Sequence, residues 1–176
     1  MSLAVGQDYG RPPVTQLKTQ AVVDIKGVRT SLPTKGTPSV IVFATSDCPI
    51  AGRMAPYLAE IVDQNPKLPF YVVMPAGTPS KEIEVWRTRT AMPERVALVR
   101  DDDLRKCLKV DVVPTSVVVL PDGKVAYYGR INDLYQSHSV PKPRPQRNDL
   151  SLAIQEVLAG KPVSLPYAPA VGCFLG

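Results

Sequence analysis

The sequence is short of the side chains that most metal and cofactor sites use. It contains one histidine, one tryptophan, three phenylalanines and three cysteines among 176 residues. A single histidine with no second ligand makes a poor metal site, so we expect no metal, and nothing implies a nucleotide or flavin cofactor. No apolar run approaches the ~20 residues that a membrane-spanning helix needs, so we expect no membrane insertion.

Positive charge is present but is not gathered into a recognition motif. The formal net charge is +5 and the isoelectric point is near 9.2. The basic residues between positions 87 and 109 are scattered among acidic ones, and no aromatic residues accompany them in a nucleic-acid-binding pattern. We therefore interpret these charges as a solvated surface and expect no nucleic-acid partner.

The N-terminus shows no basic segment followed by an apolar stretch, which a secretory signal peptide would need. We expect a cytoplasmic protein, or a periplasmic or otherwise extracytoplasmic one if a signal peptide has been removed. The cysteine count is odd, so in an exported protein at least one thiol stays unpaired. With 44% apolar residues the chain is long enough to bury one well-formed core.

The most informative stretch covers residues 38–58. Residues 39–44 are β-branched or aromatic for the most part and predict a buried strand, and the segment that follows has apolar residues at helical spacing. Pro49 suits the first position of a helix, which places Cys48 at or beside the N-cap. A thiolate there accepts hydrogen bonds from free amides such as that of Ala51 and is stabilised by the helix dipole.

Cysteines in such positions have pKa values lowered from ~8.5 to roughly 3.5–7.5. Arg53, about one turn further along, would assist the thiolate, whereas the adjacent Asp47 would oppose it. The alternative is that Cys48 is only a small buried hydrophobic residue, as free cysteine often is. The local sequence favours a reactive thiol.

Three stretches of the chain resemble the thioredoxin superfamily. Phe-Ala-Thr-Ser-Asp-Cys-Pro-Ile-Ala at 43–51, followed by Met-Ala-Pro at 54–56, is similar to its active-site strand, turn and helix. Val-Pro-Thr at 113–115 resembles its cis-proline loop. Residues 22–32 resemble the N-terminal hairpin of the redoxin branch, which includes alkyl hydroperoxide reductase and thiol-specific antioxidant proteins.

The resemblance implies a fold and a substrate site. The fold is an α/β sandwich of three layers around a central mixed sheet, with an N-terminal β-hairpin and an extended C-terminal tail. Pro114 would be cis, against the usual preference of X-Pro bonds for trans, and its loop would lie against Cys48 and bind an extended thiol or disulfide protein substrate. The residues expected to contact a substrate are Thr45, Pro49, Arg53, Val113, Pro114 and Thr115.

Two departures from the family pattern bear on activity. Thioredoxin-like reductants use Cys-x-x-Cys, but Ala51 stands where the second cysteine would be. Thr45-x-x-Cys48 resembles the core of peroxiredoxins, but Ile41 replaces the proline that opens their longer motif. We expect a thiol-disulfide redox protein with Cys48 as nucleophile. The alternatives are a thiol peroxidase that reacts with peroxide, and a redox-silent binding module.

The chain divides into an irregular arm over 1–20, a redoxin domain over 21–160 and a tail over 161–176. The tail is too rich in proline for a helix and too apolar for a solvated end, so we expect it to pack on the domain. Its ending resembles that of some bacterial redoxin-like proteins and carries Cys173, the possible partner of Cys48. A disulfide between them requires Cα atoms about 4.4–6.8 Å apart. The alternative is an idle thiol, or one that links two chains.

We expect no redox role for Cys107 or for His138. Cys107 shares i, i+3, i+4 spacing with Leu104 and Leu108, so we expect it to pack on the core face of a helix. His138 lies far in sequence from Cys48, and a catalytic base must be within hydrogen-bond reach of its nucleophile. We therefore expect no catalytic role for it.

The remaining elements follow from apolar patterning, caps and turn residues. We predict a buried strand at 70–74, a helix at 81–90 with Ser80 as N-cap and Val85 and Trp86 inward, a strand at 95–99, a helix at 101–110, a hairpin of 115–120 and 124–130 at the sheet edge, and a helix from Asn148 or Asp149 to about Ala159.

Overall fold

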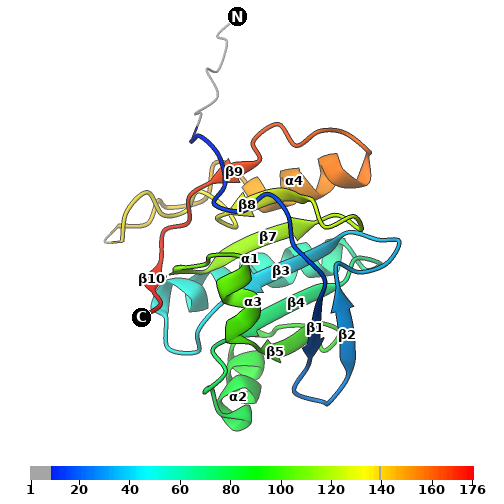
Figure 1. The fold of residues 1–176 in the computed structure, drawn as a ribbon. Coiled ribbons are helices and arrows are strands. Elements are labelled where there is room, and N and C mark those ends of the chain that lie inside the picture. The colour runs from blue at the N-terminus through cyan, green and yellow to red at the C-terminus, as the bar shows by residue number, and fades with distance from the viewer. Residues whose placement is uncertain (1–8, 139) are drawn as a thin grey trace, which may run out of the picture.

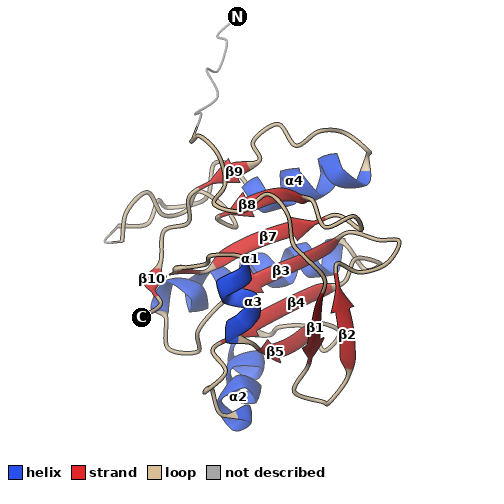
Figure 2. Ribbon diagram, in the orientation of Figure 1, coloured by secondary structure: helices blue, strands red, loops and turns tan. Residues whose placement is uncertain are grey.

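The computed structural model describes residues 9–138 and 140–176. Its centre is a six-stranded mixed sheet in the order β5-β4-β3-β7-β8-β9 (Figure 1). Figure 2 shows α3 in front of this sheet and α1 and α4 behind it. The predicted three-layer α/β architecture is therefore confirmed.

The central strand β3 (Ser39–Phe43) is buried along its whole length. It pairs parallel with β4 (Phe70–Met74) on one side and antiparallel with β7 (Thr115–Val119) on the other. β4 continues in parallel to β5 (Ala97–Arg100), and β7 pairs antiparallel with β8 (Val125–Gly129). Because both faces of the sheet are covered, the central strands are continuous apolar runs without polar alternation.

The helices are α1 (Pro49–Gln64), α2 (Ser80–Thr90), α3 (Asp102–Cys107) and α4 (Asp149–Leu158). α1 ends at Gln64 and contains Pro56 in its interior. It buries Ile50, Met54, Leu58 and Ile61, which recur at helical spacing and form one apolar face. In the part of the chain that the structure describes, no helix has the length and apolar character needed to cross a membrane.

Two predictions about α2 are wrong. The N-cap is Pro79, whose extended backbone makes it the last residue before the helix, so Ser80 is already helical. Trp86 is buried as expected, but Val85 is 54% exposed. The buried stripe of α2 runs through Ile83 and Trp86, and the residue before Trp86 is rotated about 100° away from that stripe.

The prediction that Cys107 packs in the core is also wrong, because Cys107 is an exposed free thiol. α3 ends at Cys107 instead of continuing to 110, since Lys109 adopts a left-handed φ of 51° that terminates the helix. Leu104 and Leu108, one turn apart, fill the core side. Cys107 points about 100° away from Leu108 around the helix axis.

The N-terminal hairpin is confirmed. β1 (Gln20–Val23) and β2 (Arg29–Leu32) pair antiparallel as a separate two-stranded sheet. The turn between them contains Gly27 with a positive φ of 84°, which glycine adopts without steric cost.

The prediction that the hairpin of β7 and β8 lies at the sheet edge is wrong. β9 (Tyr167–Ala168), from the tail, adds to β8 in parallel and becomes the edge. The approach is close enough that a Cβ at Gly129 would lie 1.8 Å from the carbonyl oxygen of Ala168. A two-residue strand flanked by prolines carries no alternating pattern, so the sequence does not reveal it.

The tail contacts the rest of the structure a second time through β10 (Cys173–Phe174). This strand pairs antiparallel with β6 (Val112–Val113) in a small separate sheet. Figure 1 shows the red tail running from β9 to β10, where the chain ends beside the start of α1. The tail therefore lies along the domain, and it brings its cysteine to the N-terminus of the helix that follows Cys48.

Candidate functional site

Cys48 caps the N-terminus of α1, as the sequence predicts. Its Sγ accepts a hydrogen bond from the backbone amide of Ala51 at 3.4 Å, and Pro49 occupies the first helical position. The first amides of a helix have no partner within the helix, and the sulfur satisfies one of them. The side chain is only 4% exposed.

Cys48 is joined by a disulfide to Cys173, 125 residues away in sequence, with the two Cα atoms 6.1 Å apart. That distance lies within the range of about 4.4–6.8 Å that disulfides occupy. Of the alternatives that the sequence leaves open for Cys173, the structure shows the pairing with Cys48, and the tail supplies the second sulfur that position 51 lacks. Cys107 is left as the free thiol.

The loop that contains Pro114 lies directly against Cys48. The Val113–Pro114 peptide bond is cis, as the resemblance implied. The Sγ of Cys48 is 3.7 Å from the carbonyl oxygen of Val113, and Cys173 stands opposite Val113 in the β10–β6 pair. The hydroxyl of Thr115 donates to the carbonyl oxygen of Val112 at 2.7 Å, so Thr115 is buried and holds the loop from within.

A cavity of about 520 Å³ opens beside the disulfide. Its walls come from the turn before Cys48, the segment between β4 and α2, and the end of the tail. Thr45 lines this cavity, and its contact with a substrate stays a prediction. Arg53 is exposed on α1 and does not line it, so its support for the thiolate stays a prediction.

The turn before Cys48 is held in place by α2, a feature that the sequence analysis missed. Arg89 Nη2 donates to the carbonyl oxygen of Ser46 at 2.6 Å, and the hydroxyl of Ser46 donates to the carboxylate of Glu82. Both partners lie on α2. No local pattern predicts these contacts, because the two segments are separated by more than thirty residues of sequence.

An ionic cluster around the buried carboxylate of Asp149 lies behind the Pro114 loop. Arg130 Nε and Arg147 Nε donate to the two carboxylate oxygens of Asp149 at 2.7 and 2.8 Å. Burial by itself would lower the pKa of Arg130, but the hydrogen bond to Asp149 and the charge of that carboxylate raise it, so the guanidinium stays charged. Pro114, Arg130 and Val171 of the tail share a cavity of only about 10 Å³.

Asp133 organises the loop that follows β8. Its carboxylate accepts hydrogen bonds from Lys142 Nζ at 2.6 Å and from the backbone amides of Gln146 and Arg147 at 2.7 and 2.9 Å. Burial would raise the pKa of Asp133, but these hydrogen bonds outweigh burial and lower the pKa below its ordinary value.

His138 and Gly172 lie at the site although sequence reasoning did not place them there. The His138 ring stacks on Phe174 with centroids 5.8 Å apart and an interplanar angle of 25°. A Cβ at Gly172 would lie 1.8 Å from the carbonyl oxygen of Val113. Both contacts depend on where the tail docks, which no short-range sequence signal specifies.

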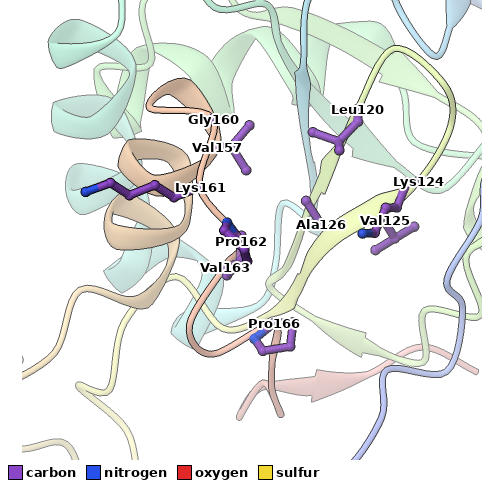
Figure 3. A pocket seen from close by; sticks show the side chains of 10 residues that line it. All are labelled: Leu120, Lys124, Val125, Ala126, Val157, Gly160, Lys161, Pro162, Val163 and Pro166. Carbon is purple, nitrogen blue, oxygen red and sulfur yellow. The ribbon is translucent and has the colours of Figure 1, made fainter.

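Another cavity, of about 540 Å³, lies between the C-terminal end of α4 and the β7–β8 hairpin (Figure 3). Apolar side chains such as Leu120 and Val157 form its walls, with Lys124 and Lys161 among the lining residues. It includes no cysteine and none of the residues expected to bind a substrate. Within residues 9–138 and 140–176, no group of three or more metal-ligating side chains comes together.

No model of a known protein family matches the sequence, and neither does any curated protein. Solved structures do match. A conserved uncharacterised protein from Geobacillus kaustophilus has a TM-score of 0.77 and 19% identity, over 92% of this chain and 90% of that one. The thioredoxin domain of a thiol-disulfide oxidoreductase from Bacteroides vulgatus has a TM-score of 0.58 and 18% identity, over 89% and 99%.

A third match is a secreted disulfide oxidoreductase from Mycobacterium tuberculosis, described as homologous to DsbE of Escherichia coli. Its TM-score is 0.55 at 18% identity, over 83% of this chain and 96% of that one. At identities this low the likeness establishes the fold alone.

Proposed function

The chain has the thioredoxin-like α/β fold that its sequence predicts, and we propose that it is a thiol-disulfide redox protein whose nucleophile is Cys48 and whose resolving thiol is Cys173. The observation that carries this proposal is the Cys48–Cys173 disulfide at the N-terminus of α1, against the Pro114 loop. The substrates are thiol or disulfide groups of proteins. The neighbours from Bacteroides vulgatus and Mycobacterium tuberculosis, both described as disulfide oxidoreductases, support the same chemistry.

The reaction begins from the reduced dithiol. The thiolate of Cys48, stabilised by the Ala51 amide and the helix dipole, attacks one sulfur of a substrate disulfide. A bond forms between Cys48 and that sulfur, and the other substrate sulfur leaves as a thiolate. The thiolate of Cys173 then attacks Cys48, which forms the Cys48–Cys173 disulfide and releases the second substrate thiol. Two electrons have passed from the protein dithiol to the substrate, and the reverse sequence oxidises a dithiol substrate.

The way the tail is anchored suits a resolving role. β9 is held to β8 by backbone hydrogen bonds on both sides of Tyr167, and only residues 169–172 separate this anchor from Cys173. A short tether keeps the resolving thiol at high effective concentration near Cys48 even when the disulfide is open. In this proposal residues 21–160 form the redox domain, residues 1–20 its arm and residues 161–176 the resolving tail.

The test is turnover of a protein disulfide, such as that of insulin, with three single variants. Cys48→Ser should abolish turnover, and Cys173→Ser should trap a mixed disulfide between Cys48 and substrate that mass spectrometry detects. Cys107→Ser is the matched control and should behave as the unmodified protein. Turnover that persists in Cys48→Ser would contradict the proposal, and absence of turnover by the unmodified protein would favour a redox-silent binding module.

A peroxidase is the second candidate, because Thr45 lines the same cavity as Cys48. Here the Cys48 thiolate would reduce hydrogen peroxide to water and become a sulfenic acid, and Cys173 would condense with it to release a second water and form the same disulfide. The two candidates differ in their oxidant. Rapid Cys48 oxidation by low-micromolar peroxide favours the peroxidase, whereas inertness to peroxide combined with disulfide exchange excludes it.

We place this chemistry in an extracytoplasmic compartment. Stable disulfides persist where the surroundings are oxidising, and the Mycobacterium tuberculosis neighbour is described as secreted. Fractionation of the source cells with an antibody to the chain tests the assignment, since recovery in the cytoplasm would contradict it.

A further inference from the structure

The tail docks beside Cys48 as an added strand. β10 pairs antiparallel with β6, and the pairing continues as the amide of Leu175 donates to the carbonyl oxygen of Asp111 at 2.8 Å. These are backbone contacts, so another extended chain segment can make them in the same register. What restricts such a segment is the space around each of its side chains.

The position before the cysteine has no room for any side chain. A Cβ at Gly172 would lie 1.8 Å from the carbonyl oxygen and 2.5 Å from the carbonyl carbon of Val113. Both atoms belong to the backbone of the loop that carries Pro114, so they cannot rotate aside as a flexible side chain would. A segment that docks in this register therefore needs glycine directly before its cysteine.

The position after the cysteine is open and has one aromatic neighbour. Phe174 remains 76% exposed, yet its ring stacks on His138. Apart from the tail's own Phe174 and Leu175, which a docking segment would replace, the residues that line the cavity beside the disulfide include the acidic Asp47 and Glu82. An aromatic residue at this position therefore finds the His138 ring as a stacking partner and an open groove, without a steric limit on its size.

We propose that the tail is an internal copy of the substrate, and that the reduced site selects an extended protein segment of the form Gly-Cys-aromatic. The proposal rests on the proposed function, because the cysteine of this segment must exchange with Cys48. The segment arrives as a disulfide, its cysteine sulfur bonds to Cys48, and its former partner leaves as a thiolate. Cys173 then displaces the segment as a thiol when the tail recovers its place on β6.

The experiment measures how fast Cys48 reacts with model peptides in the full chain carrying Cys107→Ser and Cys173→Ser. Each peptide carries its cysteine as a mixed disulfide with 2-nitro-5-thiobenzoate, the better leaving group, whose release is followed by absorbance. The peptides are Val-Gly-Cys-Phe-Leu, its Gly→Ala analogue and its Phe→Asp analogue, all blocked at both ends. The glycine peptide should react faster than the alanine analogue by at least about tenfold, and faster than the aspartate analogue by a smaller factor.

The outcomes separate the inference from the function. Equal rates for the glycine and alanine peptides would overturn the inference but leave the proposed function standing, because Cys48 still exchanges with a disulfide. The same holds if Cys48 reacts with glutathione disulfide but with none of the peptides. If Cys48 reacts with neither the peptides nor glutathione disulfide, the proposed function fails as well.

The tail itself offers a second test that needs no peptide. Gly172→Ala in the otherwise unchanged chain should lower the equilibrium constant for closing the Cys48–Cys173 disulfide against glutathione by about tenfold or more. Gly176→Ala is the matched control, because a Cβ there meets no atom within 4 Å. Equal closing constants in the two variants would overturn the steric requirement at position 172.

Discussion

Cys48 lies at the N-terminal end of one helix and Cys107 at the C-terminal end of another, and the two cysteines differ in burial and in bonding. Cys48 precedes α1, where unpaired amides point at its sulfur, and it is buried and bonded to the tail. Cys107 is the last residue of α3, where the helix presents carbonyl oxygens, and it is exposed and free. A helix N-terminus stabilises a thiolate and a C-terminus does not, so exposure alone does not make a thiol reactive.

The largest expected effect is on activity. Cys48→Ser should reduce disulfide turnover by more than about a hundredfold, because the nucleophile is lost. Cys107→Ser should leave turnover unchanged. Steady-state reduction of insulin disulfides measures both, and a comparable loss in Cys107→Ser would break the distinction between the two thiols.

The next largest effect is on which thiol forms a disulfide with Cys48. Ala51→Cys restores Cys-x-x-Cys within α1, and the new thiol lies next to the amide that already contacts the Cys48 sulfur. We expect a disulfide between Cys48 and the introduced thiol to form in competition with the Cys48–Cys173 bond. Peptide mapping after mild oxidation measures the ratio of the two, and a product linked only through Cys173 would show that the tail outcompetes a local partner.

The Cys48–Cys173 bond should also stabilise the fold, because it closes a loop of more than one hundred residues. Cys173→Ser should lower the free energy of unfolding by about 2–4 kcal/mol relative to the oxidised protein. Cys107→Ser, at an exposed position, should change it by less than about 0.5 kcal/mol. Urea unfolding under oxidising conditions gives the change in unfolding free energy for each variant. Equal changes in the two variants would mean that the Cys48–Cys173 bond does not stabilise the fold.

The smallest expected effect is on how the free energy of unfolding changes in acid. Since the pKa of Asp133 is lower in the fold than in the unfolded chain, its stabilising contribution is complete above the ordinary aspartate pKa and is lost as pH falls through the lowered one. Asp133→Asn removes that contribution. The unfolding free energies of the two proteins should differ at neutral pH and converge in acid, whereas a constant difference would point to packing instead of charge.

The sequence predicts α1 and Cys48 well because the relevant forces are local. The strand composition of residues 39–43 and the fixed φ of Pro49 act within a few residues, so the strand, the turn and the N-cap follow from the chain itself. The cis form of Pro114 is different, because intrinsic preference favours trans and only the resemblance implied cis.

The errors and omissions arise where tertiary contacts decide. Cys107 fits an apolar i, i+3, i+4 pattern, but a helix of six residues has one buried turn and Leu108 occupies it. Gly172 reaches the site, and Phe174 reaches the His138 ring, only because β9 and β10 dock the tail, and two-residue strands carry no periodicity that a sequence can display.

The most direct measurement of the central claim is differential alkylation with peptide mapping across glutathione buffers of graded redox potential. The account predicts that Cys48 and Cys173 become protected together, with one shared midpoint and a two-electron slope, while Cys107 follows a separate curve. If Cys48 becomes oxidised while Cys173 stays open to alkylation, the tail is not the resolving partner and the account is wrong.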